Sequence, residues 1–319
     1  MITIKEALLA AQAMLSDTHE ASEAKLEAQL LLQHVLNVNR AWLITHESDA
    51  LQTNTHAAFE SLLNRRLTGE PIAHILGYRE FFGFKLKVTP DTLIPRPDTE
   101  TLVETALSKI PKNTTPAPFQ RTSGSSDFQQ YQDKMFDSEP RRDDSFDILD
   151  LGTGSGAIAI AIAKHAPYVE VTAADASTAA LAIAKENAAA LQISNVQFLS
   201  SNWFSSLKGT RFDIIVSNPP YIEQDDTHLS QGDLRFEPMS ALASGADGLD
   251  DIRHIITTCI IHLKPQSWLM LEHGYNQAER VADLMANAGL VDIETIHDLG
   301  GNDRVTIGKN PLIVSTHWD

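Results

Sequence analysis

The sequence predicts an α/β fold: a mostly parallel, seven-stranded sheet with helices on both faces, preceded by a small helical bundle and a linking β-hairpin. Two observations predict it. From Phe146 onward, short apolar runs alternate with helical stretches, and the expected strands are too apolar to have one solvent-exposed face. Before residue 70, apolar residues instead recur at helical spacing. The 319 residues, 43% of them hydrophobic, suffice for both cores.

The first 80 residues are expected to form the helical domain. Thr3 and Glu6 match the capping-box pattern at the start of its first helix. The apolar residues three and four positions apart lie at 4–14, 26–35 and 59–67. The signals for the last helix are Asn54 or Thr55 as its cap and Gly69 with Pro71 as its end.

A short alternating pattern at 81–94, around Gly83 and Pro90, predicts a hairpin within a linker that spans 81–97. The α/β domain is then expected to occupy 98–319 and to open with a helix from Asp98 to Ile110. Residues 112–145 are rich in Ser, Thr, Pro, Gln and Asp and have almost no apolar periodicity. Because such a segment cannot offset its ordering entropy by burial, we expect a flexible polar insertion there.

The rest of the α/β domain is expected to alternate strands and helices. The expected strands are Asp147–Leu151, Glu170–Ala174, Val196–Ser200, Asp213–Ser217, Trp268–Glu272, Asp292–Ile296 and Arg304–Gly308. The expected helices are Gly156–His165, Ala179–Leu191, Leu249–Leu263 and Gln277–Ala288. In such sheets ligands bind beyond the carboxyl ends of the strands, so the residues that follow each strand are the candidates for a site.

Charge and composition exclude several function classes. The chain has 25 basic and 42 acidic side chains, a net charge of −17, which disfavours nonspecific binding to nucleic acid. Its single cysteine, Cys259, cannot form an internal disulfide, which fits a cytoplasmic location. We expect no metal, since the 12 histidines lack metal-ligand spacing. No membrane span or export signal is expected either.

A glycine-rich turn follows the first strand of the α/β domain. The residues are Gly152, Thr153, Gly154, Ser155 and Gly156. Glycines allow a sharp turn and a close approach to a ligand, and the next helix presents its amide groups there. The turn also satisfies the G-x-G-x-x-A pattern of dinucleotide sites, and a tight turn without a ligand has the same composition.

The next two strands end at residues that suit an adenosine. Asp175 can accept hydrogen bonds from both hydroxyls of a ribose, and its register with the glycine turn favours this over the alternative, an ordinary helix cap near Ser177. Asn202 offers a carbonyl oxygen to an adenine amino group. Trp203 supplies an apolar wall to the site or packs as simple core.

The fourth strand runs into Asn218-Pro219-Pro220-Tyr221, the most informative segment of the chain. Two prolines remove two backbone donors and stiffen the turn. The Asn218 side-chain oxygen and the Pro219 carbonyl are then a fixed pair of acceptors for both hydrogens of a planar NH2 group, and Tyr221 can stack on its face. A nitrogen that attacks a methyl sulfonium becomes more positive, so these acceptors favour the transition state.

These segments resemble class I S-adenosylmethionine-dependent methyltransferases. Further stretches are similar to the HemK/PrmC family of protein-glutamine methyltransferases, which act on bacterial peptide chain release factors. They are Gly77–Gly83, Leu93–Glu100, Gly232–Pro238 and Gly301–Arg304. The resemblance implies a seven-stranded, Rossmann-like sheet with an antiparallel final strand, and an N-terminal helical domain that docks the substrate. Asn202 departs from the family, which commonly carries Asp there.

The resemblance implies transfer of a methyl group from S-adenosyl-L-methionine to the side-chain nitrogen, N5, of the glutamine in the Gly-Gly-Gln loop of class 1 release factors, a translation-termination function. The residues expected to bind the cofactor are Gly152, Thr153, Gly154, Ser155, Gly156, Asp175, Asn202, Trp203 and Asn218. Asn218, Pro219 and Tyr221 are the expected catalytic residues, and Pro220 joins them in binding the substrate.

Two other functions remain compatible with parts of the sequence. A methyltransferase for the amino groups of nucleobases shares the NH2 geometry, but the net charge of −17 and the lack of a basic recognition region argue against it. A nucleotide-binding or NAD-dependent module accounts for the glycine turn but not for Asn218 to Tyr221. His254 and His262 are expected on a helix surface, and the turn at 272–274 suits either the site or a simple strand end.

Overall fold

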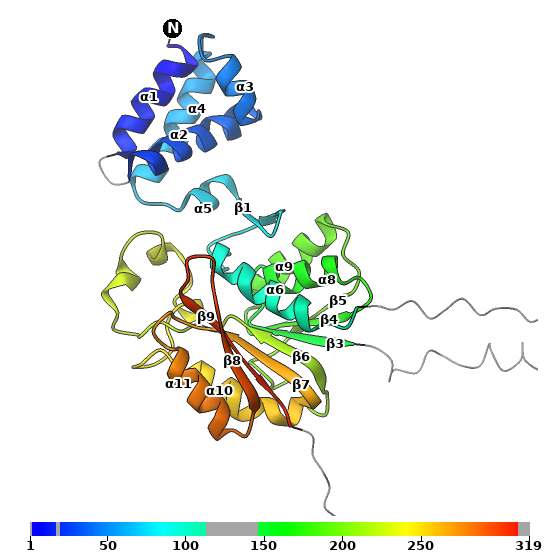
Figure 1. Cartoon of the computed structure of the whole chain (residues 1–319). Helices are drawn as coiled ribbons and strands as arrows, with labels where there is room; N and C mark the ends of the chain where they lie inside the picture. The colour runs from blue at the N-terminus through cyan, green and yellow to red at the C-terminus, as the bar shows by residue number, and fades with distance from the viewer. Residues whose placement is uncertain (1, 17–19, 113–145, 312–319) are drawn as a thin grey trace, which may run out of the picture. The chain divides into compact units, whose positions relative to one another are not determined.

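The computed structural model describes residues 2–16, 20–112 and 146–311 (Figure 1). The expected insertion at 112–145 lies outside the described residues except for Lys112. The chain divides into two compact units. One comprises Met1–Arg96 with Pro220–Asp250, and the other comprises Pro97–Pro219 with Asp251–Asp319. Among the described helices, none has the length and apolarity needed to cross a membrane.

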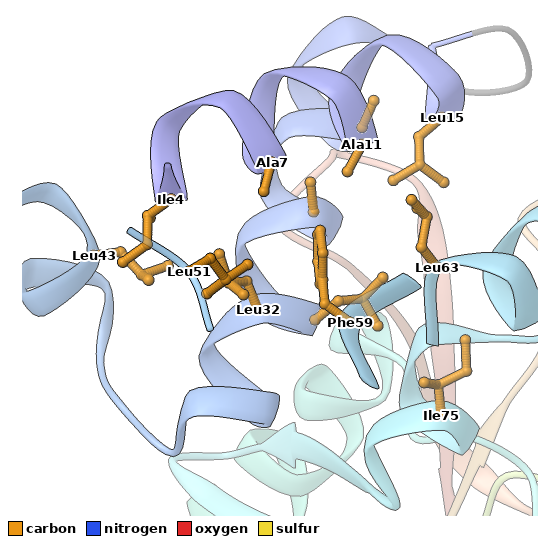
Figure 2. Packing of buried hydrophobic residues seen from close by; sticks show 13 residues of the cluster. Ile4, Ala7, Ala11, Leu15, Leu32, Leu43, Leu51, Phe59, Leu63 and Ile75 are labelled. Carbon is orange, nitrogen blue, oxygen red and sulfur yellow. The ribbon is translucent and has the colours of Figure 1, made fainter. Parts of the chain in front are cut away.

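The helices of the first unit are α1 (Ile4–Leu15), α2 (Ala21–Leu36), α3 (Arg40–Thr45), α4 (Thr53–Leu67) and α5 (Ile72–Leu76). Their apolar faces meet in one core, which includes Ile4, Ala7 and Leu15 of α1 and Phe59 and Leu63 of α4 (Figure 2). The capping box is confirmed: Thr3 accepts from the Glu6 N–H, and the Glu6 carboxylate accepts from the Thr3 N–H. Helices α3 and α5 are too short to give a periodic signal and were not expected.

The start expected for α4 was wrong, whereas its expected end is confirmed. The helix begins at Thr53 after Gln52, which makes no side-chain cap, so Asn54 and Thr55 lie inside its first turn. It ends at Leu67 with Thr68 as its C-cap, and the expected stop is confirmed: Gly69 has a φ of 92°, and the N–H groups of Gly69 and Glu70 donate to the Arg66 and Arg65 carbonyls. Polar residues that follow one another at a helix start all resemble caps, so pattern alone does not choose among them.

The hairpin lies earlier than expected. Strands β1 (Tyr78–Phe81) and β2 (Phe84–Lys87) pair antiparallel across a two-residue turn. Phe82 and Gly83 in that turn both have positive φ, 49° and 79°, as the tight turn of a hairpin requires. The expectation of a hairpin over 81–94 was therefore too late: Gly83 is in the turn, and Pro90 lies beyond β2.

Residues 220–250, which the sequence analysis assigns to the α/β domain, group with the helical unit. They contain the short 3-10 helices η3 (Thr227–Ser230), η4 (Leu234–Phe236) and η5 (Met239–Ala241). The buried Glu237 carboxylate accepts from the Ile94 N–H at 2.8 Å and pairs with Arg96. The Arg235 guanidinium donates to the Thr68 carbonyl at 3.1 Å. These contacts join segments that are remote in sequence.

The second unit contains the expected seven-stranded sheet, in the order β5-β4-β3-β6-β7-β9-β8. The strands are β3 (Asp147–Leu151), β4 (Glu170–Asp175), β5 (Val196–Ser200), β6 (Phe212–Ser217), β7 (Leu263–Glu272), β8 (Val291–His297) and β9 (Asp303–Lys309). Strands β3 to β7 run parallel. The last strand, β9, lies antiparallel between β7 and β8, as expected.

Helices cover both faces of this sheet: α6, α8 and α9 lie on one face and α10 and α11 on the other (Figure 1). Their bounds are α6 (Glu100–Lys109), α8 (Ala157–His165), α9 (Thr178–Ala190), α10 (Asp250–Cys259) and α11 (Ala278–Asn287), with the 3-10 turns η1 (Pro97–Thr99) and η6 (Ile260–His262). The helix expected over 249–263 is shorter, and β7 already begins at Leu263. Pro265 keeps Lys264, the residue before it, out of the helical region, so a helix cannot extend to it.

Candidate active site

The register of the parallel strands brings the expected site residues to one edge of the sheet. Leu151 of β3 lies beside Ser217 of β6 and beside Ala174 of β4. Asp175, at the end of β4, lies beside Ser200 of β5. The residues that follow these strand ends are the glycine turn, Asn202 with Trp203, and Asn218, so segments expected to act together are neighbours in the second unit.

The glycines of the turn differ in what surrounds them. Gly152, Gly154 and Gly156 all have positive φ, at 72°, 55° and 84°. A Cβ on Gly156 would lie 2.9 Å from Ile160 Cδ1 and 3.1 Å from Ala184 Cβ, so Gly156 is required by helix packing. A Cβ on Gly154 would meet no atom within 4 Å. The open side of the turn is therefore at Gly154.

A buried carboxyl group lies beneath this turn. Asp150 Oδ2 accepts from the Thr153 hydroxyl at 2.6 Å and from the Ala159 N–H at 3.2 Å. Asp150 is completely buried, and this burial raises its pKa to about 7 despite the two hydrogen bonds. Through these bonds Asp150 ties the turn to the first residues of α8.

The Asp175 carboxylate accepts hydrogen bonds from two backbone N–H groups. Its Oδ2 accepts from the Gly154 N–H at 2.8 Å, and its Oδ1 accepts from the Ser177 N–H at 2.8 Å. The cap of α9 itself is Ser177, whose hydroxyl accepts from the Ala180 N–H. The Asp175 side chain stays half-buried. A carboxylate has about four acceptor positions, so two remain for a ligand.

Asn202 and Trp203 line a pocket of about 650 Å³ together with residues of α10. This volume is in the range of small-molecule sites. Trp203 is only half-buried, and its indole Nε1 donates to Asp251 Oδ1 at 3.0 Å. The same ring lies close to Gly152, because a Cβ there would be 3.4 Å from the Trp203 ring. Trp203 therefore links the pocket to the glycine turn.

Asn218 follows β6, and its carboxamide contacts the Thr99 side chain. Its Nδ2 donates to the Thr99 hydroxyl oxygen at 3.2 Å. The preceding Ser217 donates to the Leu151 carbonyl at 2.7 Å, which holds the end of β6 against β3. Pro219 is buried. The next two residues, Pro220 and Tyr221, belong to the first unit, in which Ile222 and Ala243 form a parallel bridge.

Sequence reasoning missed a group of residues next to Asn218. Thr99 is 4% exposed and lies 119 positions away in the sequence. Its neighbour Asp98 pairs with Arg304 at 3.4 Å. Arg304 Nη2 also contacts Asp298 Oδ2 at 3.0 Å, and hydrogen bonds that include the Asn302 N–H hold the pKa of the Asp298 carboxyl below its usual range. In the sequence, the only signal for Asp98, Thr99 and Arg304 was that they lie in the stretches 93–100 and 301–304, which resemble the family's motifs.

Two histidines of the described residues are buried, His262 and His273. The surface position expected for His262 was wrong, because its ring stacks on Phe204 at 4.7 Å and its Nδ1 contacts the Thr210 carbonyl at 3.0 Å. His273 is fully buried, and its Nε2 contacts Thr306 Oγ1 at 2.8 Å. Burial lowers the pKa of His273, because it disfavours the charged form of the ring. No group of metal-ligating side chains suited to a metal ion occurs in the part of the chain that the structure describes.

Family comparisons match both parts of the chain. Residues 6–77 match the family described as PrmC N-terminal domain, and residues 135–236 match the family described as methyltransferase small domain. A solved structure titled protein-(glutamine-N5) methyltransferase (release factor-specific), from Alicyclobacillus acidocaldarius, is 29% identical and covers 71% of this chain and 99% of its own, with a TM-score of 0.39.

Curated relatives extend along nearly the whole chain. The release factor glutamine methyltransferase of Vibrio cholerae is 45% identical over 309 residues, which is 97% of this chain and 97% of that protein. The Escherichia coli protein of the same name is 42% identical over 291 residues, 91% of this chain and 94% of that protein. With this identity over this length, the chain belongs to the release factor glutamine methyltransferase family.

Proposed function

We propose that this protein transfers a methyl group from S-adenosyl-L-methionine to the side-chain nitrogen, N5, of the glutamine in the Gly-Gly-Gln loop of class 1 peptide chain release factors. One observation is the main support for the location of the proposed active site. The register of β3, β4, β5 and β6 brings the glycine turn, Asp175, Trp203 and Asn218 to one edge of the sheet. That edge is where open parallel sheets bind their ligands.

The residues at this edge fit the cofactor. Gly154 leaves open space in front of the turn, and Asp175 retains acceptor positions for the ribose hydroxyls. Asn202 and Trp203 border a pocket beside this edge, and the Trp203 ring lies next to Gly152 of the turn. Thr153, Ser155 and Gly156 complete the turn between β3 and α8. When bound, S-adenosyl-L-methionine supplies an electrophilic methyl group on its sulfonium sulfur.

The reaction needs acceptors more than it needs a strong base. Asn218 Oδ1 and the Pro219 carbonyl oxygen accept the two N–H bonds of the substrate carboxamide, with Pro220 stiffening the turn and Tyr221 stacking on the amide plane. As the N–CH3 bond forms and the S–CH3 bond breaks, the nitrogen becomes more positive and its N–H groups become stronger donors. The two acceptors therefore stabilise the transition state more than the ground state. The nitrogen then loses one proton to solvent.

The assay is transfer of labelled methyl from S-adenosyl-L-methionine to a purified release factor. We expect labelling of the wild-type release factor and none when the glutamine of its Gly-Gly-Gln loop is changed to Ala. Equal labelling of that variant would refute the substrate assignment. Labelling of DNA or RNA in place of the protein would instead support a nucleobase methyltransferase.

Asn218→Ala tests the catalytic role. We expect turnover to fall about 100- to 1,000-fold, the usual effect of removing one transition-state hydrogen-bond partner. Cofactor affinity, measured by calorimetry, should stay within about threefold, because the glycine turn and Asp175 remain intact. Full turnover by the variant would reject the role of Asn218.

A further inference from the structure

The Asn218 carboxamide can act as proposed only in one orientation. Its oxygen is an acceptor, and its NH2 group is a donor. The substrate nitrogen also carries two N–H donors, so Asn218 must present Oδ1 and direct Nδ2 elsewhere. In the structure Nδ2 donates to Thr99 Oγ1 at 3.2 Å, which leaves Oδ1 at the opposite end of the carboxamide.

We propose that Thr99 is a positioning residue that holds the Asn218 carboxamide with Oδ1 available to the substrate amide. This inference rests on the proposed function of Asn218 and adds a residue to it. A hydroxyl can donate as well as accept, so a flipped carboxamide would keep a bond to Thr99. The flip would, however, set the Asn218 NH2 against the substrate NH2. Thr99 therefore holds the carboxamide in place, and the substrate amide selects the orientation in which Oδ1 faces it.

Burial makes this hydrogen bond effective. Thr99 is 4% exposed and Asn218 is only partly exposed, so water competes weakly for the Nδ2 donors. A buried NH2 group without a partner is costly. If the Thr99 hydroxyl were lost, the Asn218 side chain would rotate to find another acceptor and would take Oδ1 out of position.

A charged network holds the turn that carries Thr99. Thr99 is the last residue of η1, and Asp98 in the same turn pairs with Arg304 at 3.4 Å. The Arg304 guanidinium donates to Asp298 Oδ2 through Nε at 3.2 Å and through Nη2 at 3.0 Å. The Asp298 side chain is 2% exposed. The network joins η1 to β9, and it gives a role to the motifs at 93–100 and 301–304.

The test compares Thr99→Val, which removes the hydroxyl and keeps the shape, with Thr99→Ser, which keeps the hydroxyl and removes the methyl group. Turnover on a release factor, cofactor affinity and thermal stability are measured for each. We expect Thr99→Val to lower kcat about tenfold with cofactor affinity unchanged. We expect Thr99→Ser to retain kcat within threefold while its melting temperature falls by a few degrees, because a buried methyl is lost.

A matched control is Thr105→Val. Thr105 is also buried, in α6, but its hydroxyl donates to the Thr101 carbonyl of the same helix at 2.7 Å. We expect its kcat to stay within twofold of wild type. If Thr99→Val has wild-type kcat, or if Thr99→Ser loses as much kcat as Thr99→Val, the positioning role is wrong. The proposed function fails separately, when the wild-type enzyme does not label the Gly-Gly-Gln glutamine.

Discussion

Gly154→Ala separates ligand contact from backbone strain. Gly154 has a φ of 55°, and its Cβ position has no heavy atom within 4 Å. The added methyl group therefore meets no steric clash within the protein. The only loss of stability is that of placing a non-glycine residue in the left-handed conformation, about 1–2 kcal/mol. The same methyl group enters the space proposed for the cofactor. Overpacking a fitted contact costs about 2 kcal/mol, so we expect the cofactor Kd to rise about 30-fold.

Gly209 and Gly156 provide the controls. Gly209 has a φ of 79° and also meets nothing within 4 Å, so Gly209→Ala carries the same strain away from the glycine turn. Gly156→Ala adds contacts at 2.9 Å and 3.1 Å to the strain, for a total destabilisation of about 2–5 kcal/mol. Calorimetric titration with S-adenosyl-L-methionine and scanning calorimetry measure both effects. The reasoning is refuted if Gly154→Ala binds as tightly as wild type, or if Gly209→Ala weakens binding equally.

Three further predictions concern buried or charged groups. Asp175→Ala should weaken cofactor binding by about 1–3 kcal/mol by titration calorimetry, the effect of losing charge-assisted hydrogen bonds; unchanged affinity would contradict the ribose contact. Burial raises the pKa of Asp150 to about 7, so between about pH 4 and 7 the native state holds a proton that the unfolded state has released. As the pH rises through this range, the free energy of unfolding therefore falls by about 4 kcal/mol in all. Urea unfolding of Asp150→Asn across this range should lack that decline, and an equal decline in both proteins would show that Asp150 is not its source. Burial raises the pKa of the Cys259 thiol to about 12, so a thiol reagent at pH 8 should label Cys259 only after unfolding; rapid labelling of the native protein would show that the helix opens.

The sequence predicted most of the α/β unit because its signals are local. Five residues from Asp147 to Leu151 are apolar enough to be read as a buried strand, and the glycines that follow can be recognised as a left-handed turn without knowing their partners. The strands predicted from such runs agree with the structure to within one residue, except for β7, which starts five residues earlier than expected.

What sequence reasoning missed depends on partners remote in the chain. Nothing near His262 indicates that Phe204 will cover its ring, so a polar residue near a helix end was placed on the surface. The bond between Thr99 and Asn218 spans 119 positions. A threonine before a helix suggests a cap, and only the folded chain shows that its hydroxyl serves a different side chain.

The position of β9 has a consequence for the order of folding. Strand β9 follows β8 in the chain but lies between β7 and β8 in the sheet. Until Asp303–Lys309 has been synthesised, β8 has no neighbour to pair with and β7 presents an open edge. A nascent chain that ends before β9 would therefore expose an unpaired apolar edge that can pair with another chain. Insertion of β9 between β7 and β8 completes the sheet and removes this aggregation-prone edge.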